Sequence, residues 1–271
     1  MTDEVKSKLA KKYFLYIDIL GFSELVAEQG RIKDLYERFD SLNAHTHPSF
    51  QAIVFSDTML VFNKDDLEWD ESDKQALVTR LCEFAADLFY RLISQNIHFR
   101  AYICCGEFEH SKMQHIDAFY GPALIHAYQR EREIQCTGLF IDNDLVPYLG
   151  WFHSSKYDQH SHFVHLMQTL DTISYEESSY PIDWNLIGPT GADVWASYDI
   201  TYLKNIYEHM HDMSRPPRVR VKYLSAWQMI QIRHRALLSV LERSKFDPKA
   251  ICDLDWRPAF AKIGTDDGYF K

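Results

Sequence analysis

The chain has 271 residues, of which 46% are hydrophobic and 25% are charged, and its formal net charge is −10. This length fits one large domain or one domain with a substantial extension, and the apolar share is enough for a real core. The acidic balance argues against general binding to a nucleic-acid backbone, because little positive charge is left to neutralise phosphates.

The cysteines and the apolar stretches indicate the cellular compartment. The five cysteines are odd in number and form no CxxC pair, which indicates reduced thiols. The N-terminal stretch MTDEVKSKLAKK lacks the apolar core of a signal peptide, and no stretch approaches the ~20 apolar residues of a membrane span. We therefore expect a cytoplasmic protein that binds neither membranes nor nucleic acid.

The first predicted element is a strand at residues 13–20, YFLYIDIL, which Gly21 ends. Helical spacing follows at residues 22–28 and 31–43. Asp18 would be a charged residue near the end of this apolar strand, and burying an unpaired carboxylate costs several kcal/mol or more. The carboxylate therefore either meets a partner or lies where the strand opens onto solvent. In the simplest alternative it only caps the helix that follows.

A β-hairpin is predicted next. Residues 50–55 and 58–63 are two β-rich runs separated by two residues, which is hairpin spacing. Asp57 lies in the turn between them, so a second acidic residue stands at the end of a strand. Taken alone, an Asp in this position is usually an ordinary turn residue.

The rest of the chain continues the alternation of helices and strands. Ser72 and Gln75 have capping-box spacing before an amphipathic helix that runs to about Ser94. Strands are predicted at 98–108, 137–142 and 162–167, a loop after residue 108, and helices at 121–132, 191–211 and 219–243.

This order of elements indicates an α+β fold. It is typical of a ferredoxin-like palm, an antiparallel-rich sheet with helices on one face. The composition shifts near Gly188, so we expect a catalytic domain at residues 1–188 and a helical C-terminal extension at residues 189–271.

The two acidic residues are expected to meet in such a palm, because the first strand and the hairpin are neighbours. Two close carboxylates repel, and one of them would retain its proton unless a cation lies between them. Mg²⁺ takes carboxylates together with waters and substrate phosphates as ligands. Asp18 and Asp57 therefore form a candidate metal site that is suited to two-metal chemistry.

Four sequence blocks resemble the class III nucleotidyl cyclases and occur in that family's order. They are YIDILGF, FSDTM, FRAYICCGE at 99–107 and YGPALIHAYQRE at 120–131, and together they span roughly residues 13 to 167. The resemblance implies that Asp18 and Asp57, with the carbonyl of Ile19, hold two Mg²⁺ or Mn²⁺ ions. It also implies that the 3′-hydroxyl of a nucleoside triphosphate attacks its own α-phosphorus and that pyrophosphate leaves.

The same resemblance implies further parts of the site. Arg100 matches an arginine that meets the phosphates, a role suited to its bidentate fork. The alternative for Arg100 is a plain ion pair on the sheet. In the family the sites form at a dimer interface with residues from both chains, so a homodimer is expected.

The helix at 121–132 departs from the family pattern. The positions of the family's catalytic Asn and Arg fall on Ile125 and Gln129. A slip of one residue would place His126 and Arg130 there instead, which makes Arg130 the candidate catalytic residue.

The base-reading positions depart from the purine cyclases as well. They fall on Ile53 and Ala118, and neither side chain can hydrogen-bond a purine edge; Asp117 is a possible substitute for Ala118. We expect Phe50, Ile53 and Tyr120 to build a smaller and more apolar base pocket, with Asp117 beside it.

A cyclase with intact metal ligands and no purine reader resembles the pyrimidine cyclases of Pycsar antiphage systems. This resemblance implies conversion of UTP to cyclic UMP as a second messenger in antiphage defence. The alternatives are a cytidylate cyclase, a purine cyclase, and a non-catalytic domain that binds a nucleotide or a protein partner.

Overall fold

The computed structural model describes residues 9–65, 70–169 and 192–265. The expected boundary near residue 188 lies outside these residues, so the division into two domains stays a prediction. None of the described helices combines the length and the apolar character that a transmembrane span needs.

A seven-stranded sheet forms the centre of the molecule. In spatial order its strands are β2 (Phe50–Phe55), β3 (Thr58–Asn63), β1 (Lys11–Ile19), β4 (Phe99–Glu107), β7 (Gly138–Asp142), β9 (Ser161–Val164) and β8 (Ser154–Lys156). All neighbouring pairs are antiparallel except β4 and β7. The predicted hairpin is present with the predicted bounds.

The first four strands have ferredoxin-like connectivity. Helices separate β1 from β2 and β3 from β4, and the spatial order is β4-β1-β3-β2 with every pair antiparallel. The predicted α+β class is therefore confirmed.

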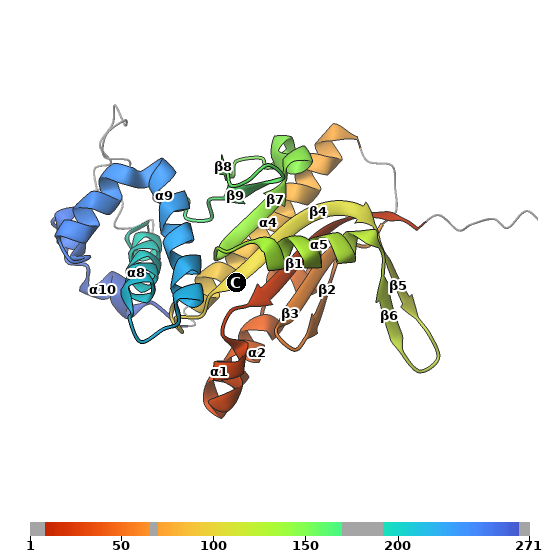
Figure 1. The fold of residues 1–271 in the computed structure, drawn as a ribbon, viewed down its shortest axis with the longest axis horizontal. Coiled ribbons are helices and arrows are strands. Elements are labelled where there is room, and N and C mark those ends of the chain that lie inside the picture. The colour runs from red at the N-terminus through yellow and green to blue at the C-terminus, as the bar shows by residue number, and fades with distance from the viewer. Residues whose placement is uncertain (1–8, 66–69, 170–191, 266–271) are drawn as a thin grey trace, which may run out of the picture.

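Helices cover both faces of the sheet. The helices of this part are α1 (Phe22–Ala27), α2 (Gln29–Asp40), α3 (Asn43–Thr46), α4 (Glu71–Ile93) and α5 (Pro122–Glu133). In Figure 1, α4 lies behind the sheet and α5 crosses in front of it. Side chains of a strand alternate between the faces, so Arg100, Tyr102 and Cys104 of β4 face α5. We expected helices on one face of the sheet. This holds for the helices of the ferredoxin-like part, whereas α5 covers the other face.

Three helices and a short turn follow in the C-terminal part. They are α8 (Ala192–His211), α9 (Pro217–Arg243), the 3₁₀ turn η3 (Pro248–Ala250) and α10 (Arg257–Ala261). They gather at one end of the sheet (Figure 1). Tyr90 of α4 donates to the Asp199 carboxylate of α8 at 3.0 Å, and Asn96 contacts His209 of α8 at 2.9 Å. The extension is thus docked on the palm by buried polar contacts as well as by apolar packing.

Two local expectations differ from the structure. Asp70, rather than Ser72, caps α4, because its carboxylate accepts the Asp73 backbone N–H at 2.8 Å. The expected loop after residue 108 instead forms a two-stranded ribbon, β5 (Glu109–Lys112) with β6 (Asp117–Tyr120), which projects from the far end of the sheet (Figure 1). A 3₁₀ turn, η1 (Asn143–Tyr148), also precedes the short strand β8.

Candidate active site

Asp18 and Asp57 lie at the same end of neighbouring strands. Asp18 of β1 is the register partner of Thr58 in β3, and Asp57 directly precedes Thr58 in the hairpin turn. The Ile19 backbone N–H donates to the Asp57 carbonyl oxygen at 3.0 Å. This hydrogen bond ties the turn to the end of β1. The structure thus brings the two predicted carboxylates to one place, although 38 residues separate them in sequence.

Asp18 is electrostatically unfavourable as a charged group. Burial and, to a lesser extent, the Asp57 charge raise the pKa of Asp18 to about 6, while Arg100 and Lys222 act in the opposite direction. A nearby cation would relieve both unfavourable effects, because it favours the ionised form.

Arg100 is the immediate neighbour of Asp18 on the next strand. It is the register partner of Asp18, and its guanidinium lies 3.7 Å from the Asp18 carboxylate. It also donates to the Glu131 carboxylate and, at 2.6 Å, to the Ile134 carbonyl, both at the end of α5. The side chain is buried, and among the described residues its Nε atom finds no hydrogen-bond partner. Most of the guanidinium is therefore used within the chain, as in the ion-pair alternative.

The oxygen donors at this place fit a hard divalent cation. Across residues 9–65, 70–169 and 192–265, no three or more His, Cys, Asp or Glu side chains are grouped to hold a metal ion. Mg²⁺ commonly uses only one or two carboxylates and completes its shell with waters and phosphates. The two aspartates and the predicted Ile19 carbonyl meet that requirement, whereas they lack the nitrogen or sulfur ligands that zinc prefers.

Arg130 is not brought to the aspartates. Its guanidinium donates to the Asp158 carboxylate at 2.7 Å and to Ser161 at 3.3 Å, beside the Tyr102 hydroxyl. It lines a different hollow of about 1000 Å³, together with His126, which contacts Asp142 at 3.0 Å. Within one chain, Arg130 therefore faces the β9 side of α5 and not the β1 side.

The predicted base-pocket residues of β2 are split between the faces of the sheet. Ile53 shares the face of Asp18, because it pairs with Leu60, which pairs with Tyr16. Phe50 points to the other face, where it is 2% exposed and packs edge-on against Phe84 of α4 at 5.2 Å. The structure thus does not support Phe50 as a pocket residue, because its ring is enclosed in the core.

Asp117 and Tyr120 belong to the projecting ribbon. Asp117 lies 3.7 Å from His110, whose ring contacts Gln51 of β2 at 2.9 Å. Gln51 stands in the strand row of Phe14, four residues before Asp18, which is roughly 14 Å along the strand. A ligand atom held at Asp18 would not touch these residues of the same chain.

Sequence reasoning missed a cleft beside Asp18. It has a volume of about 800 Å³ and is lined by Gly21 after β1, by Arg100, and by Arg218 and Lys222 of α9. The run RPPRVRVK at 215–222 was a visible basic signal. Only the docking of the C-terminal helices places it next to the end of β1.

Comparisons with known proteins find similarity in structure but none in sequence. No family model and no curated protein matches the sequence. The adenylyl cyclase CyaB from P. aeruginosa is similar in structure with a TM-score of 0.43 and 12% identity, over 58% of this chain and 94% of that one. The guanylate cyclase domain of RhGC from Catenaria anguillulae, solved with GTP, has a TM-score of 0.42 and 12% identity, over 58% and 97%. A bacterial light-regulated adenylyl cyclase has a TM-score of 0.43 and 10% identity, over 59% and 92%. TM-scores of this size do not support the assignment of a function, which must therefore be based on the strand order and the geometry of the site.

Proposed function

We propose that the protein is a metal-dependent nucleotidyl cyclase. The observation that carries this proposal is the meeting of Asp18 and Asp57 at the end of β1 and the β2–β3 turn of a ferredoxin-like sheet. A cleft with several cations opens beside them. Phosphoryl chemistry on a nucleoside triphosphate requires two components. One is a set of carboxylates that binds a divalent ion, and the other is a group of nearby cations that binds the phosphates.

The side chains of this chain have separate roles in the proposed reaction. Asp18 and Asp57 hold Mg²⁺ or Mn²⁺ ions, with the Ile19 carbonyl as a further ligand. Such ions, when bound, favour ionisation of an attacking hydroxyl and neutralise the leaving phosphates. Arg100 positions Asp18, because it is itself fixed by Glu131 of α5 and by the carbonyl of Ile134, which follows α5.

The preferred substrate in this proposal is UTP and the product is 3′,5′-cyclic UMP, a second messenger in antiphage defence. Ile53 supports a pyrimidine, because this partly buried, apolar side chain lies on the Asp18 face where a purine cyclase needs a hydrogen-bonding group. The resemblance to pyrimidine cyclases supplies the rest. CTP is the closest alternative.

A homodimer is part of the proposal. Phe55, Ile125 and Tyr128 are 50%, 58% and 45% exposed, and they lie at the end of β2 or on α5, on the Asp18 face of the sheet. A second copy related by a two-fold axis would cover these side chains. It would also bring its own Asp117 and Tyr120 toward the aspartates, which the same chain does not.

The test is incubation of the purified protein with each of the four ribonucleoside triphosphates and Mn²⁺, with products identified by mass spectrometry. A cyclic pyrimidine product that is lost in Asp57→Asn, and kept in the surface control Asp34→Asn, supports the proposal. A cyclic purine product would keep the cyclase and reject the pyrimidine preference. Absence of any product would favour the non-catalytic alternative, with which the internal ion pairs of Arg100 and Arg130 are also compatible.

A further inference from the structure

The cleft beside Asp18 is formed jointly by the palm and the C-terminal helices. One wall comes from the turn after β1 and from the end of α5, and the other from the segment around the start of α9. Its cations are Arg31, Arg100, Arg132, Arg215, Arg218 and Lys222, against the two acids Glu24 and Asp212. The whole chain has 29 Lys and Arg residues against 39 Asp and Glu residues, so this excess of cations is local.

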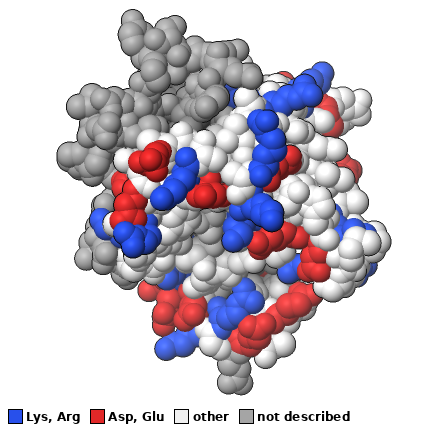
Figure 2. Space-filling view, turned by 90° about the vertical axis from the view of Figure 1, so that its left-hand side faces the viewer, with Lys and Arg blue, Asp and Glu red and all other residues white. Residues whose placement is uncertain are grey.

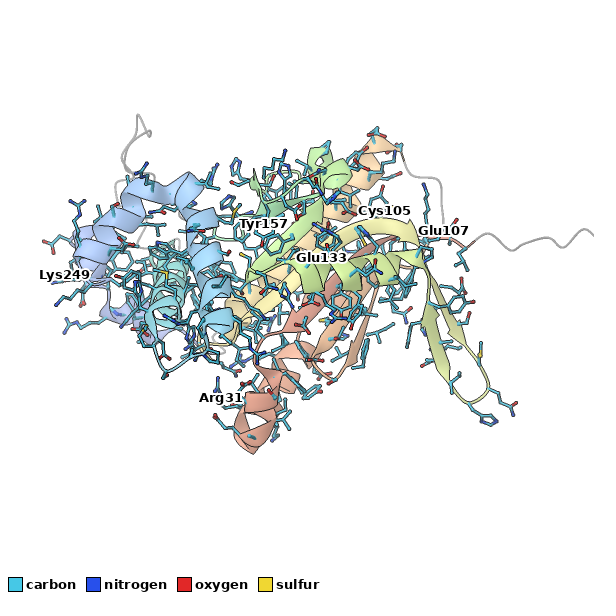
Figure 3. The ribbon with its side chains drawn as sticks, viewed as in Figure 1. Arg31, Cys105, Glu107, Glu133, Tyr157 and Lys249 are labelled. Carbon is cyan, nitrogen blue, oxygen red and sulfur yellow. The ribbon has the colours of Figure 1, made fainter. Side chains whose placement is uncertain are left out.

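The outer surface on the side of the C-terminal helices carries charges of both signs (Figure 2). Figure 2 shows the side of the molecule that carries the C-terminal helices, where Lys and Arg side chains alternate with Asp and Glu. Arg31 of α2, labelled in Figure 3, also lines the cleft, and its guanidinium donates to the Gln95 carbonyl at 2.9 Å.

Several of these cations already have partners. Arg31 lies 3.6 Å from Glu28, and Arg215 lies 3.1 Å from Asp212. Within the described part of the chain, Lys222 and Arg218 make no hydrogen bond or ion pair. Lys222 is half-buried, and burial together with the nearby Arg100 lowers its pKa. A half-buried ammonium without a partner is unfavourable, and an anion in the cleft would provide that partner.

A buried donor points to the same conclusion. Arg100 lines the cleft, and its buried Nε atom has no hydrogen-bond acceptor among the residues that the structure describes. In addition, the first turn of the 27-residue helix α9 borders the cleft, and the N-terminal end of a long helix favours an anion. Arg100, which lines the cleft, lies 3.7 Å from the Asp18 carboxylate, so the cleft adjoins the candidate metal ligands.

We propose that Lys222 and Arg218 of the C-terminal extension bind the β- and γ-phosphates of the substrate and then the pyrophosphate product, an assignment that rests on the proposed function. In the reaction, the 3′-oxygen bonds to the α-phosphorus and loses its proton to solvent. The bond from the α-phosphorus to the bridging oxygen breaks, and its electron pair leaves with pyrophosphate. Lys222 and Arg218 neutralise the charge that builds up on this leaving group.

Binding of inorganic tripolyphosphate to the full chain tests the proposal without turnover. Calorimetric titration is carried out in EDTA, so that only the cations of the chain contribute. Lys222→Met and Arg218→Gln should each weaken binding by about tenfold or more, because each removes a charge-assisted contact. Lys249→Met is the control, since Lys249 lies on the outer side of the C-terminal helices (Figure 3), and it should bind like the wild type.

The outcomes separate the two proposals. If both cleft variants bind tripolyphosphate like the wild type, or if the wild type does not bind it, the phosphate assignment is wrong even where the protein cyclises a nucleotide. If binding is lost in the variants but no triphosphate is turned over, the anion site stands and the cyclase proposal fails. Arg218 is exposed, so Arg218→Gln retains the test if Lys222→Met does not fold. In an active enzyme, both variants should raise KM for the triphosphate.

Discussion

Asp18→Asn tests whether the charged carboxylate of this candidate metal ligand lowers the stability of the folded protein. The structure raises the pKa of Asp18 from 3.8 to about 6. A carboxyl group with a higher pKa in the folded than in the unfolded chain contributes stability below pH 3.8, and this contribution is lost as the pH rises to about 6. The difference corresponds to about 3 kcal/mol. Because the side chain is 22% exposed and solvent screens its charge, we expect about 1–2 kcal/mol.

The assay is urea unfolding in EDTA at pH 7.5. Asp18→Asn should raise the free energy of unfolding by about 1–2 kcal/mol, because the amide carries no charge to desolvate. The exposed control Asp34→Asn should stay within about 0.5 kcal/mol. Near pH 4 the gain of Asp18→Asn should nearly vanish, since Asp18 is then protonated in the folded wild type. In a parallel titration without EDTA, added Mn²⁺ should stabilise the wild type and not the variant. A variant less stable than the wild type in EDTA, or stabilised equally by Mn²⁺, would refute the reasoning.

Three further predictions concern the fold and its assembly. Burial is the main cause that lowers the pKa of His98 to about 3 and of His209 to about 4. The contribution of each histidine to the free energy of unfolding should therefore be constant above pH 6.5 and fall by about 1.4 kcal/mol per pH unit below it, so urea titrations of His209→Gln should show a shallower slope. Ile125→Glu should convert the proposed dimer into a monomer in light scattering; an unchanged mass would place the interface elsewhere. Gly121→Ala should cost more than about 2 kcal/mol in thermal unfolding, since its φ is +147° and a Cβ would collide with the Glu107 backbone.

Elements with a clear period were predictable from the sequence. Both strands of the β2–β3 hairpin have the expected bounds, because two β-rich runs separated by two residues leave little choice of pairing. The ribbon of β5 and β6 was missed because each strand has only four residues, too few for a clear alternating pattern, and in the described part of the chain the two strands form a separate two-stranded sheet. The N-cap of α4 is Asp70 and not the predicted Ser72, because the Asp70 carboxylate accepts the Asp73 N–H. Several acidic residues occur in a row here, so the sequence does not show which of them is the cap.

Some parts of the candidate site were likewise predictable from the sequence, and others were not. The proximity of Asp18 and Asp57 was predictable, because each stands at the end of a strand and the ferredoxin-like order makes these strands neighbours. The Phe50 prediction could have been corrected from the sequence alone. Residues 50 and 53 are an odd number of positions apart on one strand, so they face opposite sides of the sheet. Lys222 could not be placed, because the docking of α9 depends on tertiary packing that no local pattern encodes.

The C-terminal helices pack against the palm through buried aromatic rings. Phe89 of α4 packs edge-on against Tyr202 of α8 at 4.6 Å, and His98 against Tyr223 of α9 at 5.1 Å. These rings are buried, so removal of the helices would expose them together with part of the β4 end. The same removal would take away Lys222 and one wall of the cleft. The predicted division near residue 188 can therefore be tested by truncation. We expect residues 1–188 alone to be unstable and to lose tripolyphosphate binding, whereas a palm that folds and binds like the full chain would show that the extension is dispensable.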